Sequence, residues 1–142
     1  MERTLVLIKP EAVEKEVWFW IIKLYENHSL MIAKTKVFAP LPTQIAEQLY
    51  AEHKEKDFYP GLFAYVTSGI TIALCVVGDN AVAAVRAING ATKPNEAAEG
   101  TIRKLYGTDG RRNAAHGSAN LADAERECKI VFGDDEPVAP AQ

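Results

Sequence analysis

Cysteine is scarce in this chain of 142 residues, which contains only Cys75 and Cys128. Both cysteines lie in apolar segments, and neither belongs to a Cys-x-x-Cys or Cys/His pattern with the spacing of metal ligands. No structural zinc site is therefore indicated, and we interpret the two residues as buried free thiols in a reducing compartment.

Long hydrophobic runs and an excess of positive charge are also missing. No apolar stretch approaches the roughly 18 residues of a membrane span, and Met1-Glu2-Arg3-Thr4 leads into a short apolar run without the layout of a signal peptide. The net charge of -3 gives no bulk attraction to nucleic acid or to an anionic membrane. We therefore expect a soluble cytoplasmic protein without membrane or nucleic-acid partners, in which any phosphate recognition is local.

The composition that is present fits one compact domain, with 48% hydrophobic and 25% charged residues. Residues 133–142 are acidic and contain two prolines, so we expect a domain over 1–132 followed by a loose tail.

Hydrophobic periodicity predicts strands and helices in alternation. Strands are expected at Arg3–Ile8, Leu30–Phe38, Ile70–Val77 and Cys128–Phe132. Helices are expected at Glu11–Glu26, at Thr43–Lys54 with Thr43 as N-cap, from Asp79 or Asn80 to Gly90, and at Leu121–Glu127, with a helical turn at Leu62–Tyr65. This order predicts an α+β fold, a ferredoxin-like sandwich with a four-stranded antiparallel sheet and covering helices.

The predicted first helix is apolar almost all round between Val17 and Ile22. The core face is given by residues that recur at helical spacing, namely Val13, Val17, Trp20, Ile21 and Leu24. Trp18, Phe19 and Ile22 are apolar residues outside that face. Since a small monomer seldom leaves such a patch in water, a subunit interface is the favoured interpretation.

A long connection from Ala91 to Asn120 breaks the regular pattern and contains several glycines. Connections of this length inside a compact domain are usually functional. His116 lies here between Ala115 and Gly117, small residues that leave room for a polyanion, and Arg111 and Arg112 could meet its charge. Judged locally, a structural or merely exposed histidine is the commoner case.

Other polar and aromatic residues could belong to the same site, although each also has an ordinary structural interpretation. Lys9 lies at a strand-to-helix corner, held extended by Pro10, or is an ordinary solvated lysine. Tyr50 and His53 are three residues apart on one helix face, which fits a phosphate site or a wet amphipathic rim. Phe58, in an aromatic corner, fits core packing as well as ligand stacking.

Taken together, these side chains indicate phosphoryl transfer through a covalent intermediate. Lys9, Arg86, Thr92 and Arg103 supply cations and donors for a phosphate chain, and His116 can accept a phosphoryl group. Because the chain has neither GxxxxGK[ST] nor a kinase-type glycine loop, side chains and a metal must hold the nucleotide.

Several motifs, in one order over about Arg3–Phe132, resemble the nucleoside diphosphate kinase family. They are Arg3-Thr4-Leu5, Ile8-Lys9-Pro10, Ser68-Gly69, Gly90-Ala91-Thr92, Gly100-Thr101-Ile102-Arg103 and Asn113-Ala114-Ala115-His116-Gly117-Ser118. The resemblance implies a ferredoxin-like fold, oligomers built from dimers, and two-step transfer of a γ-phosphate, mainly from ATP, between nucleotides.

The resemblance also implies roles for individual residues. His116 is similar to the family's nucleophile, which becomes phosphohistidine, Glu127 to the carboxylate that orients it, and Ser118 to a supporting hydroxyl. Phe58 resembles the aromatic on which the base stacks. The remaining positions are implied to contact phosphates or keep the site ordered (Tyr50, His53, Arg86, Thr92, Arg103), or to read the ribose hydroxyls and bridging oxygen (Lys9, Asn113). Mg²⁺ is implied as a cofactor bound mainly by the nucleotide's phosphates, since no carboxylate cluster forms a dedicated cage.

Some positions depart from the family pattern without removing the nucleophile or a phosphate ligand. They are Glu11 for aspartate, Lys56-Asp57-Phe58-Tyr59 for Arg-Pro-Phe-Phe, Ile70 for proline, Lys93 for asparagine, Gly110 for an apolar residue, Ala119 for aspartate, and Trp18-Phe19-Trp20 for a glycine-containing stretch. These departures concern base binding and assembly. The alternative hypothesis is a nucleotide-binding or scaffold protein of the same fold with weak or no turnover, and a ferredoxin-like nucleic-acid binder is disfavoured by the acidic charge.

Overall fold

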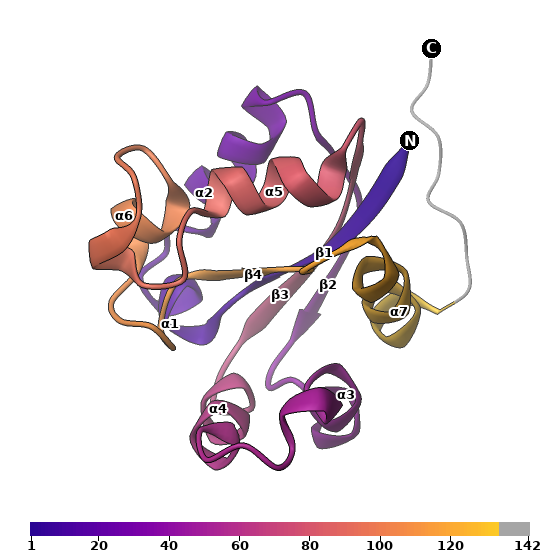
Figure 1. Ribbon diagram of the computed structural model, residues 1–142, viewed down its shortest axis with the longest axis vertical. Helices are drawn as coiled ribbons and strands as arrows, with labels where there is room; N and C mark the ends of the chain where they lie inside the picture. Colours follow the sequence, from indigo (N-terminus) through magenta and orange to yellow (C-terminus); the bar gives the residue numbers. More distant parts are fainter. Residues whose placement is uncertain (134–142) are drawn as a thin grey trace.

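A four-stranded antiparallel sheet forms the centre of the computed structural model, which describes residues 1–133 (Figure 1). Its strand order is β2-β3-β1-β4, so β2 and β4 are the two edges. The strands are β1 (Glu2–Ile8), β2 (Met31–Phe38), β3 (Thr71–Gly78) and β4 (Ala115–Gly117). Every neighbouring pair is antiparallel.

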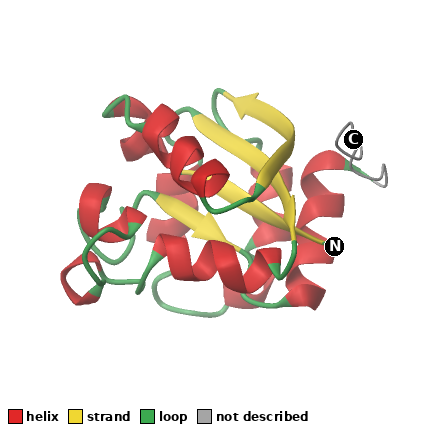
Figure 2. Cartoon of the chain, turned by 90° about the horizontal axis from the view of Figure 1, so that it is seen from above, coloured by secondary structure: helices red, strands yellow, loops and turns green. Residues whose placement is uncertain are grey.

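Helices cover both faces of this sheet, as the view from above shows (Figure 2). One layer contains α1 (Pro10–Glu14), α2 (Trp18–Asn27), α5 (Ala81–Asn89) and α6 (Ile102–Tyr106). The other contains α3 (Thr43–Leu49), α4 (Tyr59–Val66) and α7 (Leu121–Phe132), and two short 3-10 helices lie at Ala51–His53 and Pro94–Glu96. The predicted α+β sandwich is thereby confirmed. Within 1–133, none of the helices has the length and apolar character that crossing a bilayer requires.

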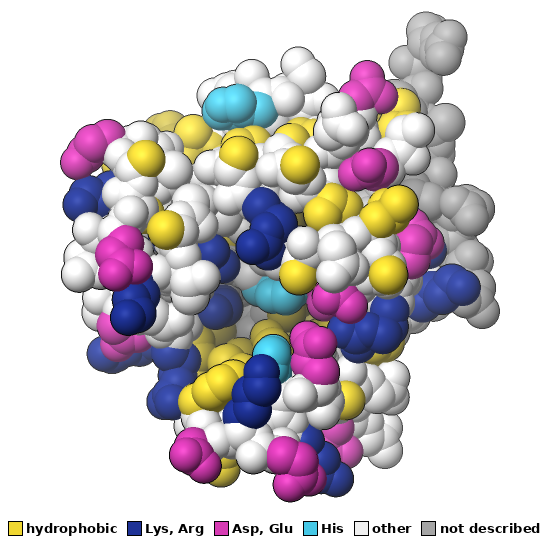
Figure 3. All heavy atoms as spheres, in the orientation of Figure 1, with side chains coloured by type: hydrophobic (Ala, Val, Ile, Leu, Met, Phe, Trp, Pro, Cys, Tyr) yellow, Lys and Arg dark blue, Asp and Glu magenta, His cyan; other side chains and the backbone are white. Residues whose placement is uncertain are grey.

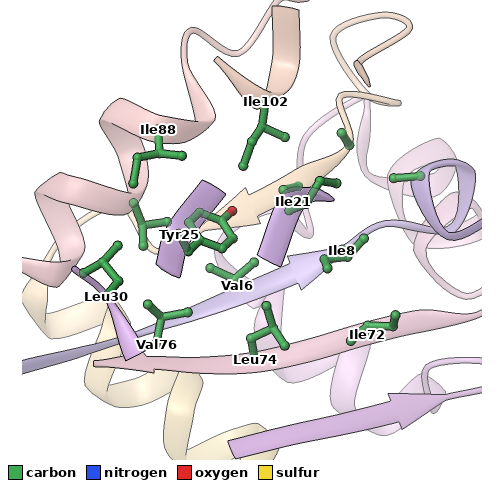
Figure 4. Packing of buried hydrophobic residues seen from close by; sticks show 14 of the residues in the cluster. Val6, Ile8, Ile21, Tyr25, Leu30, Ile72, Leu74, Val76, Ile88 and Ile102 are labelled. Carbon is green, nitrogen blue, oxygen red and sulfur yellow. The ribbon is translucent and has the colours of Figure 1, made fainter. Parts of the chain in front are cut away.

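The central strands β1 and β3 are apolar on both faces because each face is covered by a helical layer. Val6 and Ile8 point into one core with Ile21 and Tyr25 of α2, as Figure 4 shows. Leu5 and Leu7 point into the second core, against α3 and α7. The alternation along β1 therefore divides one sheet into two cores.

The single helix predicted over Glu11–Glu26 is wrong, because the chain turns between α1 and α2. Glu16 adopts the left-handed conformation with φ 61°, which ends α1 and redirects α2. Ile21 and Tyr25 then face the core. Trp20, expected in the core, is 58% exposed beside Trp18 and Phe19 at 41% and 48%. Periodicity alone could not reveal a break at a residue without a glycine or proline signal.

The strand predicted at Cys128–Phe132 is also wrong, since these residues continue α7 as one helix from Leu121. Ala124, Cys128 and Val131 recur at helical spacing on its buried face, and a five-residue apolar segment was too short to distinguish the two periods. The fourth strand is instead β4, only three residues long, which pairs with Val6–Ile8.

Smaller boundaries also differ from expectation. The helix expected to run to Lys54 ends at Leu49, and its N-cap position is Pro42 rather than Thr43, so no side chain caps it. Asn80, in a left-handed conformation, occupies the N-cap position of α5. The connection expected from Ala91 to Asn120 contains both α6 and β4. The helical turn at Leu62–Tyr65 lies within α4, whereas the tail beyond Gly133 lies outside the described residues.

Candidate active site

The edge strand β4 carries His116. Pairing of β4 with β1 sets His116 opposite Leu7 and Gly117 opposite Val6. Figure 3 shows that histidine side chains and several Lys or Arg side chains gather around a hollow between the upper and lower helical parts. A histidine on an edge strand is accessible to a ligand, while its backbone is fixed by the sheet.

A buried carboxylate orients the imidazole of His116. Glu127 Oε1 lies 2.8 Å from His116 Nε2 and accepts a hydrogen bond from Ser118 Oγ at 2.8 Å. Ser118 Oγ in turn accepts from the backbone N–H of Leu5 at 3.2 Å, which ties the group to β1. Because an ionised carboxylate only accepts, Nε2 carries a proton, and in the neutral imidazole Nδ1 then has the lone pair. Within 1–133, no hydrogen bond occupies Nδ1.

Glu127 stays ionised despite its burial. Burial raises the pKa of this carboxyl, but hydrogen bonds from His116 and Ser118 and the charge of Arg126, 3.5 Å away, hold the pKa below its ordinary value. Glu127 is only 4% exposed. The site therefore contains a fixed negative charge directed at the imidazole and shielded from water.

Lys9 is held at the corner between β1 and α1. Its Nζ donates to Asn113 Oδ1 at 2.7 Å and to the backbone oxygen of Arg111 at 3.1 Å. Burial, helped by the charge of Arg103, lowers the pKa of Lys9 to about 8. Lys9 is only 7% exposed, so the alternative interpretation as an ordinary solvated lysine is wrong.

A small polar pocket lies beside β4. Its volume is about 130 Å³, and its lining includes Arg86, Thr92, Arg103 and Gly117. Arg103 donates to the backbone oxygens of Gly90 and Ala115, both at 2.9 Å, which fixes its guanidinium. Arg86 is exposed on α5 and makes no ion pair with the described residues. Two cations on so small a pocket suit a phosphoryl group.

Aromatic rings lie beside His116 and His53. The Tyr50 ring packs edge-on against His116, with centroids 6.5 Å apart, and its buried hydroxyl has no partner among residues 1–133. The His53 ring lies 5.3 Å from that of Phe58, which is 46% exposed. Tyr50 ends α3 and His53 lies in a 3-10 turn, so they do not share one α-helical face as expected.

Arg111 and Arg112 were both expected to meet the charge of a polyanion near His116, but the structure shows each in a separate contact. Arg112 forms an ion pair with Asp109 at 2.7 Å, which shapes its own loop. The Arg111 guanidinium reaches across to α4, where it lies so close to Gly61 that an added Cβ would be 2.5 Å from Nη2. Arg111 thus packs against the start of α4, a contact that its sequence position did not signal.

Two further residues at the site were not among the site residues predicted from the sequence. Glu11 accepts from the backbone N–H of Ala114 at 2.8 Å and from the Tyr65 hydroxyl at 2.6 Å, and so ties α1 and α4 to the loop before β4. Asn89 is a buried amide at the end of α5. Glu11 adjoins Pro10 in a recognisable motif, whereas Asn89 gives no sequence signal.

The described residues contain no cluster of side chains that could bind a metal ion by themselves. Among the described residues, no group of three or more His, Cys, Asp or Glu side chains could hold a metal ion. This donor set fits a metal that arrives bound to phosphate oxygens.

An edge-strand histidine oriented by a buried carboxylate, beside a cationic pocket, is typical of phosphotransferases that use a covalent intermediate. The family model described as nucleoside diphosphate kinase matches residues 2–137. Relatives named nucleoside diphosphate kinase include one from Archaeoglobus fulgidus, 44% identical and covering 97% of this chain and 91% of the relative. One from Thermus thermophilus is 42% identical, with coverage of 96% and 98%.

Solved structures give the same result for the fold. A halophilic nucleoside diphosphate kinase from Halobacterium salinarum, in complex with CDP, superposes with a TM-score of 0.92 at 37% identity, covering 99% of this chain and 93% of that one. The Aquifex aeolicus nucleoside diphosphate kinase also gives 0.92, at 33% identity, with coverage of 96% and 99%. This chain belongs to the nucleoside diphosphate kinase family.

Proposed function

We propose that the chain transfers the γ-phosphate of a nucleoside triphosphate, mainly ATP, to a nucleoside diphosphate in two steps, through a phosphohistidine at His116. The observation that carries this mechanism is the 2.8 Å contact between Nε2 and Glu127, which leaves the Nδ1 lone pair as the nucleophile.

In the first step Nδ1 attacks the γ-phosphorus, an N–P bond forms, and the bond to the bridging oxygen breaks as the nucleoside diphosphate leaves. In the second step a terminal phosphate oxygen of another nucleoside diphosphate attacks the same phosphorus, and the N–P bond breaks. Glu127 stabilises the positive charge that develops on the imidazole when Nδ1 is bonded to phosphorus. Ser118 holds Glu127 in place.

Arg86, Thr92 and Arg103 bind the phosphate chain in this proposal. Their shared lining of one pocket and the two cationic side chains support that role. Tyr50 contributes its hydroxyl, which lacks a partner among residues 1–133. Phosphoryl transfer needs mainly positioning and neutralisation of charge, which such residues supply.

Lys9 and Asn113 read the ribose hydroxyls and the bridging oxygen. The 2.7 Å hydrogen bond between them supports joint action on one part of the substrate. Phe58 stacks on the base, and His53 supports the Phe58 ring. Stacking tolerates every base because each offers a π-face, which agrees with the CDP bound by the Halobacterium salinarum relative.

Arg86, Thr92 and Arg103 would hold the phosphate oxygens of a nucleotide that carries Mg²⁺, and the ion would supply further neutralisation of phosphate charge. The described residues fit this arrangement because they offer cations and no acidic cage.

Labelling with γ-³²P-ATP and magnesium tests the mechanism. The wild-type chain should acquire acid-labile label, GDP or CDP should discharge it as GTP or CTP, and His116→Ala should acquire none. Equal label on His116→Ala would contradict the assignment of the nucleophile. Nucleotide binding without any label on the wild type would favour the scaffold alternative.

We further propose that the chain assembles into oligomers built from dimers, located in the cytoplasm. Three adjacent exposed aromatics, Trp18, Phe19 and Trp20, support assembly, and so does the uncovered edge of β2, where Val37 is 64% exposed. The free thiols of Cys75 and Cys128 fit a reducing compartment.

A further inference from the structure

A buried amide at the end of α5 has one half of its hydrogen-bonding capacity unused. Asn89 is only 1% exposed. Its Oδ1 accepts a hydrogen bond from the Tyr25 hydroxyl at 2.5 Å, but its Nδ2 has no partner within 1–133. Buried donors in native proteins nearly always find an acceptor, so an orphaned one calls for an explanation.

The orphaned nitrogen lies beside the residue that follows His116. An added Cβ on Gly117 would be only 2.9 Å from Asn89 Nδ2, so the amide approaches this backbone because Gly117 has no side chain. Asn89 also lines the 130 Å³ pocket with Arg86 and Arg103. Asn89 therefore borders the pocket that contains two cations and no carboxylate, with its buried Nδ2 on the side of Gly117.

Tyr25 contacts the oxygen end of the amide. Its ring lies among Val6, Ile88 and Ile102 in the core (Figure 4). Burial raises the pKa of Tyr25, so the hydroxyl keeps its proton and remains a donor. Because this hydroxyl donates to Oδ1, the Nδ2 end of the amide is directed away from Tyr25.

We propose that Asn89 is a phosphate-binding residue, whose Nδ2 donates a hydrogen bond to an oxygen of the substrate's phosphate chain. The inference rests on the proposed function, because it takes the pocket of Arg86 and Arg103 as the phosphate site. A phosphate oxygen supplies the acceptor that the described protein lacks, and hydrogen bonds to an anion are stronger than neutral ones. The Tyr25–Asn89 pair then serves phosphate binding, and the unpaired Nδ2 lowers the stability of the apo protein.

The double variant Tyr25→Phe/Asn89→Leu tests this, since it replaces both polar partners by apolar groups of similar shape. Its apo Tm should equal or exceed that of the wild type, because no unpaired polar group remains. The Mg-ATP concentration that gives half-maximal labelling of His116 should rise roughly tenfold with the loss of one hydrogen bond to a charged group.

Asn89→Asp is the second variant, which keeps the size and the acceptor but loses the donor. It should raise half-saturation at least as much, because a carboxylate repels phosphate. The control is Ile88→Val, which removes a core methylene from α5 and should lower Tm without moving half-saturation.

Unchanged half-saturation in both Asn89 variants, with the wild type labelled normally, would overturn the inference and leave the proposed function intact. If the double variant fails to fold, Asn89→Asp decides by the same measurement. Absence of label on the wild type would instead overturn the proposed function.

Discussion

A single hydrogen bond at Glu127 decides the protonation of the nucleophile. Glu127→Gln replaces an acceptor by an amide, which can donate to Nε2 and move the imidazole proton onto Nδ1, where it blocks attack. The rate of His116 labelling should fall roughly 10²-fold or more. Labelling quenched at successive times measures the rate, with Glu47→Gln on the exposed face of α3 as the control. Similar rates in both variants would mean that the carboxylate does not set the tautomer.

Lys9 gives the site a pH dependence on the basic side. With a pKa of about 8 in the fold, Lys9 loses its charge above that pH, so kcat/KM for the nucleotide should decline there. Between about 8 and its ordinary 10.5 the unfolded chain binds the extra proton, so the stability of the apo protein should rise with pH while affinity falls.

The pH profile of kcat/KM and the Tm of the apo protein, both measured from pH 6 to 10, check these opposite trends. Lys9→Met should remove the basic limb near pH 8 along with most of the nucleotide affinity. If the limb persists in Lys9→Met, another group is titrating.

At the scale of elements, the turn between α1 and α2 determines which side of α2 faces the core. Glu16 makes this turn with φ 61°, a backbone conformation that is unfavourable for residues other than glycine. Glu16→Gly should therefore stabilise the protein by up to about 1 kcal/mol. Lys23→Gly, in the exposed interior of α2, should destabilise it by about 1 kcal/mol. Urea unfolding of both variants checks the opposite signs, and destabilisation in both would refute the account.

Contacts between distant elements also hold the site together. Glu11 of α1 bonds to Tyr65 of α4 and to the loop before β4, while Ser118 joins β4 to β1 and to α7. Apart from the bond between Ser118 and Glu127, these contacts join residues far apart in sequence, so the site forms only when the sheet and both helical layers are in place.

At the scale of the whole molecule, the aromatic patch of Trp18, Phe19 and Trp20 should govern assembly. Trp20→Glu places a charge at the most exposed of the three and should shift the oligomer toward smaller species. Sedimentation velocity measures the shift, with Leu121→Glu, an isolated exposed leucine on α7, as the control. An unchanged sedimentation coefficient for Trp20→Glu would exclude the patch from the interface.

The sequence alone determined the fold class, the family resemblance and the position of β1, β2 and β3, because strongly apolar segments of strand length have few alternatives. It did not determine β4 or the extent of α7. A three-residue strand has too little pattern, and Cys128–Phe132 is apolar enough to fit either period.

Only the tertiary structure decided the local environments. The lowered pKa of Lys9, the crossing of Arg111 to Gly61 and the orphaned amide of Asn89 all depend on residues far apart in the chain, and the burial of Glu127 exists only once α7 has packed on the sheet. The reason is physical: residue type sets which hydrogen bonds and charges a side chain can offer, whereas burial and partners, which shift its chemistry, exist only after the layers have packed.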